Sequence, residues 1–359
     1  MSSQRIINDR ISRRKLAKVA GGSLIAVAAA RPGRALATID PEESPSYTPV
    51  AGASLTIYSG RAEALVGPLL KEIEKDTGLK LDVRYGNTAE LAAQILEEGK
   101  KTPAGLFFAQ DAGALGALSK AGFFTELPQE TLEKVDPRFH ADNGSWIGLS
   151  GRQRVLVYNP EVTDSTTLPA SILDLPTAEL GGPIGWAPTN ASFQAFITAL
   201  RLVQGDDAAR SWLEGIIATD PVTFDGNAPQ IDAVANQEIA VGLVNHYYLY
   251  QARKETPNIK AENYTFPNGD LGALVNVAGA GIIASGDQQA AAAVALGFLL
   301  GVEAQTYFAT ETSEYPLADN VPAIPDLTPL AELQTPEIDL SNLDDLGGTL
   351  ALLTDLGLI

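Results

Sequence analysis

Two adjacent tyrosines, Tyr247 and Tyr248, follow Asn245 and His246 directly after the apolar run 240–244. A phenolate oxygen carries a negative charge, and hard trivalent cations prefer anionic oxygen ligands. A free phenol ionises at about pH 10, but a bound metal ion removes the proton at lower pH. Neighbouring residues of a regular strand point to opposite faces, so both phenols reach one ion only if the strand turns into a helix here. The segment therefore indicates an oxygen-ligand metal site.

Three other tyrosines have competing interpretations. Tyr158 ends the long apolar run 146–158, where it is either a third metal ligand or a packing residue between strands. Tyr58 ends the first expected strand, where it either reaches the site or packs in the core. Tyr250 belongs to the next face of the expected helix, and we expect it to pack or to lie at the surface.

The composition excludes several kinds of site. The 359 residues include no cysteine, which rules out disulfides, thiolate zinc, iron–sulfur clusters and cysteine nucleophiles. With only His140 and His246, a multi-histidine metal site or a Ser/His/Asp set is hard to build. No Gly-x-Ser-x-Gly elbow is present. We therefore expect no enzyme activity, and an exported hydrolase is the weaker alternative.

The charge of the chain excludes nucleic acid as a partner. The formal net charge is -19, although the first 37 residues carry eight Lys or Arg and one acid. The remainder is therefore more acidic than the net value suggests. Such a surface repels nucleic acid and anionic lipid but does not repel cations.

The N-terminus has the features of an export signal. The twin arginines Arg13 and Arg14 precede a short run of small apolar residues at 19–30, and an Ala-Leu-Ala cleavage pattern follows at 35–37. The twin-arginine pattern resembles a Tat signal over residues 1–37. Residues 38–53, rich in Pro, Glu, Ser and Thr, are typical of a tether. We expect a periplasmic protein or one on the exterior of the cell envelope.

The rest of the chain alternates between strand and helix patterns. The expected strands are 54–58, 80–85, 106–108, 184–186, 222–224 and 240–244. The expected helices are 62–77, 88–98, 112–121, 193–203, 208–216, 230–235 and 288–300. This alternation predicts an α/β fold with mixed, mostly parallel sheets and with ligand sites after the carboxyl ends of strands.

Two long apolar runs, 146–158 and 273–283, suit strands that cross between two lobes. We expect the first lobe to comprise residues 54–148 plus 279–325. The second lobe then comprises residues 149–278 plus 326–359. More than one lobe is also expected from a chain of this length.

Several segments resemble the ferric-iron-binding periplasmic proteins, which are the substrate-binding subunits of iron ABC transporters. They are Leu55–Arg61, Val83–Leu91, Pro103–Leu115, Leu149–Val155, Gly242–Tyr248, Asn276–Gly281 and Glu314–Leu317. The resemblance extends from about Ser54 to the C-terminus. It implies a two-lobed class II periplasmic-binding-protein fold, ferric iron, Fe(3+), bound in a cleft, and delivery to an ABC transporter permease by a monomer.

The resemblance also assigns metal ligands. Tyr247 and Tyr248 match the adjacent ligand tyrosines of the family, and Tyr158 matches a third tyrosine that some branches use. Other branches take a histidine from the first strand–helix turn and a glutamate from the Phe-rich strand. This chain has Arg61 in that turn and Gln110 at the glutamate position. The departure favours a tyrosine-dominated site.

Such a site is expected to be completed by a small anion, carbonate or another. Arg61 and Arg152 are the candidates to bind it, Ser150 and Gly151 offer further donors, and Asn245 matches a family position near the anion. Because related class II proteins share these lobes, the fold alone does not separate ferric iron from a small organic anion or another solute. The tyrosine pair favours iron.

Replacing Arg13 and Arg14 together by lysine retains the charge but removes the pair that the twin-arginine machinery recognises. We expect the unprocessed precursor to accumulate in the cytoplasm, as measured by fractionation and immunoblotting. Normal export and processing of this variant would contradict the Tat assignment.

Overall fold

The computed structural model describes residues 52–318 and 321–359. All of them belong to one compact unit, residues 45–359. The expected signal at 1–37 and almost all of the expected tether at 38–53 lie outside the described residues, so both stay predictions.

The first third of this unit folds as alternating strands and helices, as predicted. Its main elements are β1 (Ser54–Ser59), α1 (Glu63–Thr77), β2 (Lys80–Tyr85), α2 (Thr88–Glu98), β3 (Leu106–Ala109), α3 (Ala112–Lys120) and α4 (Gln129–Leu132). Gly78 ends α1 in the left-handed region at φ 73°, where glycine has no steric penalty. The Asn87 side chain accepts the amides of Ala89 and Glu90 at the start of α2. Local signals thus set these boundaries.

The middle of the chain repeats the alternation. Its elements are β5 (Ile184–Trp186), α5 (Ala191–Gln204), α6 (Asp206–Ala218), β6 (Val222–Thr223), α7 (Ala228–Ala235), β7 (Val241–Asn245), α8 (Tyr247–Glu255) and β8 (Glu262–Tyr264). Strand β5 pairs in parallel with both β6 and β7. Strand β7 ends at Asn245 and α8 begins at Tyr247, so the tyrosine pair lies at the carboxyl end of β7.

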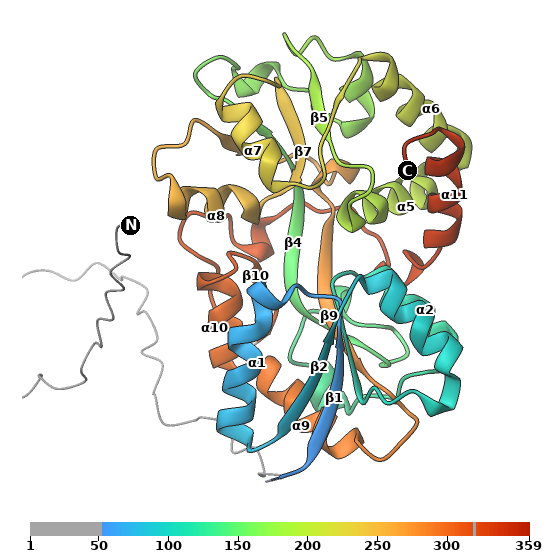
Figure 1. Cartoon of the computed structure of the whole chain (residues 1–359). Helices are drawn as coiled ribbons and strands as arrows, with labels where there is room; N and C mark the ends of the chain where they lie inside the picture. The colour runs from blue at the N-terminus through green and yellow to red at the C-terminus, as the bar shows by residue number, and fades with distance from the viewer. Residues whose placement is uncertain (1–51, 319–320) are drawn as a thin grey trace, which may run out of the picture. The chain divides into compact units, whose positions relative to one another are not determined.

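Two long antiparallel strands, β4 (Ile147–Tyr158) and β9 (Val275–Ile282), join the two sets of parallel strands (Figure 1). Strand β4 pairs with β9 over its first half and with β7 and β8 over its second half. The sheet order is β2-β1-β3-β9-β4-β7-β5-β6, with parallel pairs toward both ends and antiparallel pairs in the middle. The mixed α/β class with two crossing strands is confirmed. The division into lobes near residues 148 and 278 stays a prediction.

The C-terminal part adds elements that periodicity did not predict. They are α10 (Val302–Thr310), β10 (Tyr315–Pro316) and α11 (Leu346–Asp355), after the predicted α9 (Gln289–Leu299). Short 3-10 helices also occur: η1 (Gly99–Lys101), η2 (Pro137–Phe139), η3 (Ser165–Thr167), η4 (Ile172–Thr177), η5 (Leu271–Ala273), η6 (Leu330–Glu332) and η7 (Leu340–Asn342). Strand β10 pairs with β4 at Gly151 and Ser150. Two residues are too few for a recognisable strand pattern.

The segment 340–345, which comprises η7 and the three residues before α11, contacts two helices that are far away in the sequence, α3 and α5. At Gly113 and Gly116 of α3, an added Cβ would lie 2.4 Å from a carbonyl oxygen of the segment 341–343, so this approach requires glycine. Asp344 forms an ion pair with Lys120 of α3 at 2.7 Å. The next residue, Asp345, pairs with Arg201 of α5 at 2.8 Å. We call residues 340–345 the C-terminal tie.

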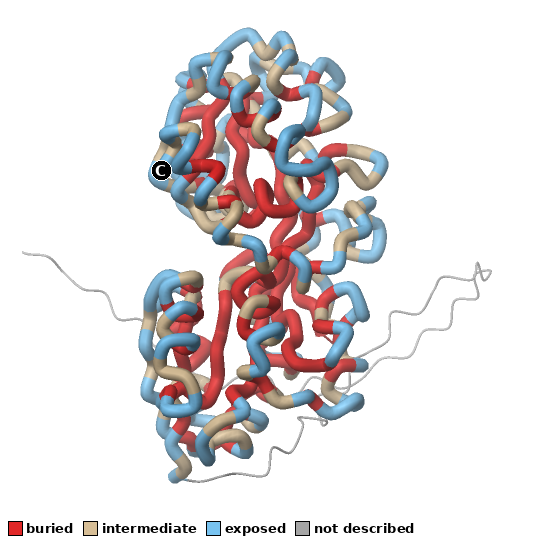
Figure 2. The backbone as a smooth tube through the Cα atoms, turned by 90° about the vertical axis from the view of Figure 1, so that its right-hand side faces the viewer, coloured by how far each residue is buried: buried red, intermediate tan, exposed pale blue. Residues whose placement is uncertain are grey.

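The two crossing strands are almost completely buried (Figure 2). Every residue of β9 is buried, and so is every residue of β4 except Tyr158. In the described part of the chain, no single helix is long and apolar enough to cross a membrane. The consecutive helices α9 and α10 reach that length and composition together, with a bend of 55° between them.

The buried side chain of Gln305 on α10 holds β10 in place with four hydrogen bonds. Its Nε2 donates to the carbonyls of Leu149 and Leu299, and its Oε1 accepts the amides of Leu317 and Ala318. Gln305→Leu leaves these buried groups unpaired, and we expect it to lower the free energy of unfolding by roughly 3 kcal/mol. Urea denaturation measures the loss.

Gln129→Leu is the matched control, because Gln129 is exposed and makes one side-chain hydrogen bond to Glu133. Its stability should change by about 0.5 kcal/mol or less. Equal stability of the two variants would contradict the role of Gln305.

Candidate metal and anion site

A tight turn from β7 into α8 brings the two adjacent tyrosines together. Strand β7 ends at Asn245, His246 precedes the first helical residue, and Tyr247 begins α8. The rings of Tyr247 and Tyr248 are stacked, with centroids 4.3 Å apart and planes inclined by 27°. The strand-to-helix turn predicted from the sequence is present, and both side chains leave it on the same side.

Neither hydroxyl of this pair has a hydrogen-bond partner among residues 52–318 and 321–359, and Tyr247 is buried. Four other tyrosines use their hydroxyls within the fold: Tyr58 with Glu98, Tyr250 with Asp326, Tyr264 with Pro169 and Tyr307 with Leu65. Burial, with the phenol of Tyr248 beside it, raises the pKa of Tyr247 well above its usual value. Tyr247 therefore keeps its proton unless a cation displaces it.

Both ring nitrogens of His246 form hydrogen bonds. Its Nδ1 accepts the Gln153 amide at 3.1 Å, and its Nε2 donates to the Ser313 carbonyl at 3.0 Å. Burial lowers the pKa of His246 to about 4. The ring is thus neutral and fixed, and it orients the start of α8 rather than offering a nitrogen to a ligand.

Strand β4 carries two buried arginines, which alternation places on one face together with Ser150. Arg152 is 1% exposed and donates from Nη2 to the Gln110 carbonyl. Its Nε and Nη1 are buried without a partner in the described chain, as is the Ser150 hydroxyl. Burial and the charge of Arg61 lower the pKa of Arg152. An anion would satisfy these groups.

Arg154 was not singled out from the sequence, although the Arg-x-Arg spacing already places it on the face of Arg152. Its side chain is buried against the rings of Phe193 and Phe196, 5.5 and 5.6 Å from their centroids. One terminal nitrogen donates to the Leu243 carbonyl at 3.2 Å, whereas Nε has no partner among the described residues.

No carboxylate in the described chain pairs with Arg154. Burial lowers its pKa to about 9, and the neighbouring hydroxyl of Tyr248 offsets only part of this effect. Its Nη1 lies 3.4 Å from the Ser192 hydroxyl in the first turn of α5. A helix start attracts anions. This corner of the site is therefore cationic and lacks a counter-ion.

The terminal nitrogens of Arg61 face a carboxylate. Nη1 and Nη2 donate to the two oxygens of Glu314 at 2.9 and 2.6 Å, and both side chains are fully buried. Burial opposes the charge of Arg61, but Glu314 raises its pKa overall. The two terminal nitrogens are therefore occupied, whereas Nε of Arg61 is buried without a partner in the described chain. The expectation that Arg61 contacts the small anion stays a prediction.

The remaining candidates separate into two groups. Asn245 faces Arg154 across the β4–β7 ladder and is brought to the site. At Gly151 an added Cβ would lie 3.2 Å from Leu317 on the other face of the strand. Its expected contribution is that of its backbone amide, which stays a prediction.

Tyr158 is not brought to the pair. It lies opposite Val241, whereas Arg154 lies opposite Asn245, so about 13 Å of strand separate the two levels. Its neighbours are the start of β7 and Glu262 of β8. The strand register and the contact of Tyr158 with the core therefore favour the packing interpretation over that of a third ligand.

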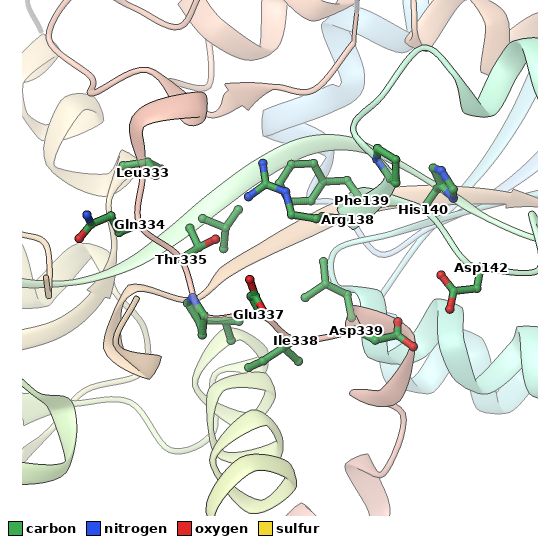
Figure 3. A pocket seen from close by; sticks show the side chains of 15 residues that line it. Arg138, Phe139, His140, Asp142, Leu333, Gln334, Thr335, Glu337, Ile338 and Asp339 are labelled. Atoms are coloured by element: carbon green, nitrogen blue, oxygen red, sulfur yellow. The ribbon is translucent and has the colours of Figure 1, made fainter. Parts of the chain in front are cut away.

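One cavity and one acidic cluster of the described chain lie away from the tyrosines. The cavity has a volume of about 620 Å³ and is lined by residues 137–140, 142, 274–275 and 333–340, none of which belongs to the tyrosine site. Figure 3 shows the side chains that line it. Among the described residues, the acids close enough to share a metal ion are Glu72, Asp76 and Glu303, on α1 and α10. They are partly or fully exposed and lie next to Lys75.

Residues 102–340 match the family described as bacterial extracellular solute-binding protein. The chain belongs to this family. The solute-binding protein is 32% identical over 314 residues to the Fe(3+)-binding periplasmic protein of Serratia marcescens, covering 86% of this chain and 92% of that one.

Solved structures agree in fold. Iron-bound HitA from Pseudomonas aeruginosa superposes with a TM-score of 0.78 at 33% identity, over 85% of this chain and 99% of that one. A Trichodesmium protein in complex with iron and citrate ligands has a TM-score of 0.74 at 26% identity, over 86% and 100%. The solute-binding protein thus has the two-lobed fold of periplasmic iron-binding proteins.

The neutral state of His246 predicts how stability depends on pH. Its pKa is about 4 in the fold and 6.5 ordinarily, so between these values the unfolded chain binds more protons. Stability of the metal-free protein should fall as the pH drops from 6.5 to 4, by about 3 kcal/mol from this group. His246→Gln should flatten the profile in urea denaturation. An unchanged slope would contradict the assignment.

Proposed function

We propose that the protein is exported and binds ferric iron outside the cytoplasm for delivery to an ABC transporter permease. Tyr247 and Tyr248 are the metal ligands, in their phenolate form. The observation that carries the proposal is a stacked pair of phenols without hydrogen-bond partners in the described chain, in which Tyr247 is buried and Tyr248 is partly buried. Similarity to periplasmic proteins named for binding Fe(3+) supports it.

The chemistry of the pair suits ferric iron. Two phenolates supply two negative charges to a hard cation that prefers anionic oxygen. Without iron the buried phenol of Tyr247 keeps its proton, because burial raises its pKa, so binding releases a proton and weakens as the pH falls. With both ring nitrogens of His246 engaged, an imidazole-ligated metal is a poorer match.

A small anion such as carbonate completes the coordination in this proposal. Arg152 and Arg154 hold it, with the Ser150 hydroxyl and Asn245 beside them. The support is the set of buried nitrogen atoms that lack partners in the described chain: Nε and Nη1 of Arg152 and Nε of Arg154. Nε of Arg61, which is also buried without a partner in the described chain, and the backbone amide of Gly151 remain further candidates to contact the anion.

The same arginines favour a second candidate, a small organic anion as the solute itself. Buried guanidinium groups bind carboxylates and phosphates well. A binding role rather than an enzymatic one is common to both candidates. Export by the twin-arginine signal, a monomeric state and handover to a permease are further parts of the proposal.

Replacing Tyr247 or Tyr248 by Phe removes one phenolate ligand and nothing else. We expect each change to weaken ferric binding by about 100-fold or more and to remove or shift the visible phenolate-to-iron absorption band. Titration with ferric nitrilotriacetate, followed in the visible range, measures both effects.

Tyr250→Phe and Tyr158→Phe are the matched controls, because Tyr250 bonds the Asp326 carbonyl and Tyr158 packs far along β4. Both should retain the band and the affinity. A wild-type protein without any band, but with affinity for a carboxylate alone, would favour the organic-anion candidate.

A further inference from the structure

The side chain of Asn276 on β9 is buried and has a donor group without a partner. Asn276 is 7% exposed, and its Nδ2 has no hydrogen-bond partner in the described chain. Its Oδ1, in contrast, accepts two backbone amides, that of Ala112 at 3.2 Å and that of Val277 at 2.7 Å. A buried donor that stays unpaired costs free energy. Nδ2 therefore needs an acceptor that the described chain does not supply.

The two amides that Oδ1 accepts fix the orientation of the side chain. The opposite orientation would bring the NH2 group of Asn276 against two N–H donors, so the oxygen must face them. One of these donors belongs to Ala112, the first residue of α3. Nδ2 therefore lies on the other side of the amide group, away from this contact.

Asn276 lies directly opposite Arg152 in the antiparallel pair of β4 and β9. Residues that are opposite each other in such a pair project from the same face of the sheet, with Cβ atoms about 5 Å apart. Ser150 projects from the same face of β4, two residues before Arg152. Four buried polar atoms of these three residues lack partners in the described chain: Nδ2 of Asn276, Nε and Nη1 of Arg152, and the Ser150 hydroxyl.

The chemistry of these four atoms favours an anion over a water molecule. The three nitrogen atoms of Asn276 and Arg152 only donate, so they cannot satisfy one another. A water molecule adds no charge that compensates the guanidinium group. A small oxyanion has several acceptor oxygens and also supplies a negative charge. Phosphate, bicarbonate and carboxylates share this chemistry.

Asn276 and Arg152 also hold the same turn between β3 and α3. Arg152 donates from Nη2 to the Gln110 carbonyl, and Asn276 accepts the Ala112 amide. These contacts fix both side chains before a ligand binds. Their free donor atoms are therefore preorganised, which lowers the entropic cost of binding.

We propose that Asn276 is an anion-binding residue, which donates from Nδ2 to the small oxyanion that Arg152 holds. This inference rests on the anion in the proposed function. It adds a contact from β9 to those from β4, so that the anion joins the two crossing strands.

The test measures anion binding to the purified, iron-free protein by isothermal titration calorimetry. The probes are inorganic phosphate and, separately, bicarbonate, at one fixed pH. Because iron is left out, the affinity reports on the anion site alone. Asn276→Ala removes the donor without changing any charge, and we expect it to weaken the binding of either anion by about tenfold.

Asn276→Asp separates this role from the contact with α3. The aspartate keeps an oxygen for the amides of Ala112 and Val277, so the melting temperature of the anion-free variant should stay close to that of the wild type. The donor is replaced by a negatively charged acceptor, which repels an anion. We expect this variant to bind phosphate more weakly than Asn276→Ala does.

Asn143→Ala is the matched control. The Oδ1 atom of Asn143 also accepts a backbone amide, that of Ser145, but its Nδ2 already donates to the Ser119 hydroxyl. This variant should retain the wild-type affinity for both anions. Melting temperatures of all anion-free variants distinguish losses of stability from losses of affinity.

Wild-type affinity for phosphate and bicarbonate in a folded Asn276→Ala variant would overturn this inference alone. If Asn276→Ala does not fold, Asn276→Asp decides, and wild-type affinity in that variant overturns the inference. A wild-type protein that binds neither anion would refute the anion in the proposed function, and this inference with it.

Discussion

The arrangement of the site depends on the burial of guanidinium groups within a crossing strand. Strand β4 is buried along nearly its whole length, yet it carries Arg152 and Arg154 in its middle. Charges in that position require compensation from whatever surrounds them. The Gln110 carbonyl, the rings of α5 and the phenol of Tyr248 supply part of it. The positive charge of the two arginines that these groups leave uncompensated makes this region suitable for an anion.

Most of the fold was predictable from periodicity and caps. The boundaries of β2 and α2 agree with the structure to the residue, because Gly78, Asn87 and Gly99 give clear local signals. The crossing strands were recognised from their unusual length. In contrast, β10 is two residues long, and its position depends on pairing with β4 and on hydrogen bonds from Gln305 of the preceding helix to Leu317 and Leu149. No local pattern encodes such a contact.

The position of the tyrosine pair was predictable from the sequence, whereas the residues around the pair were not. The tyrosine pair needed a strand-to-helix turn, which the apolar run before Asn245 indicated. Strand pairing decided the other residues. The strand register places Tyr158 beside Val241, four residues from the level of Asn245. Arg61 is committed to Glu314, which lies 253 positions along the chain. Long-range partners of this kind cannot be read from spacing in one sequence.

The C-terminal tie adds a restraint beyond the two crossing strands. Successive aspartates anchor it to α3 through Lys120 and to α5 through Arg201. Because α3 and α5 follow strands on opposite sides of the β4–β9 pair, a rotation between those sides stretches or compresses this short link. The two sides are therefore joined by three connections rather than two. Such an arrangement resists a relative twist of the two sides more strongly than bending about the crossing strands.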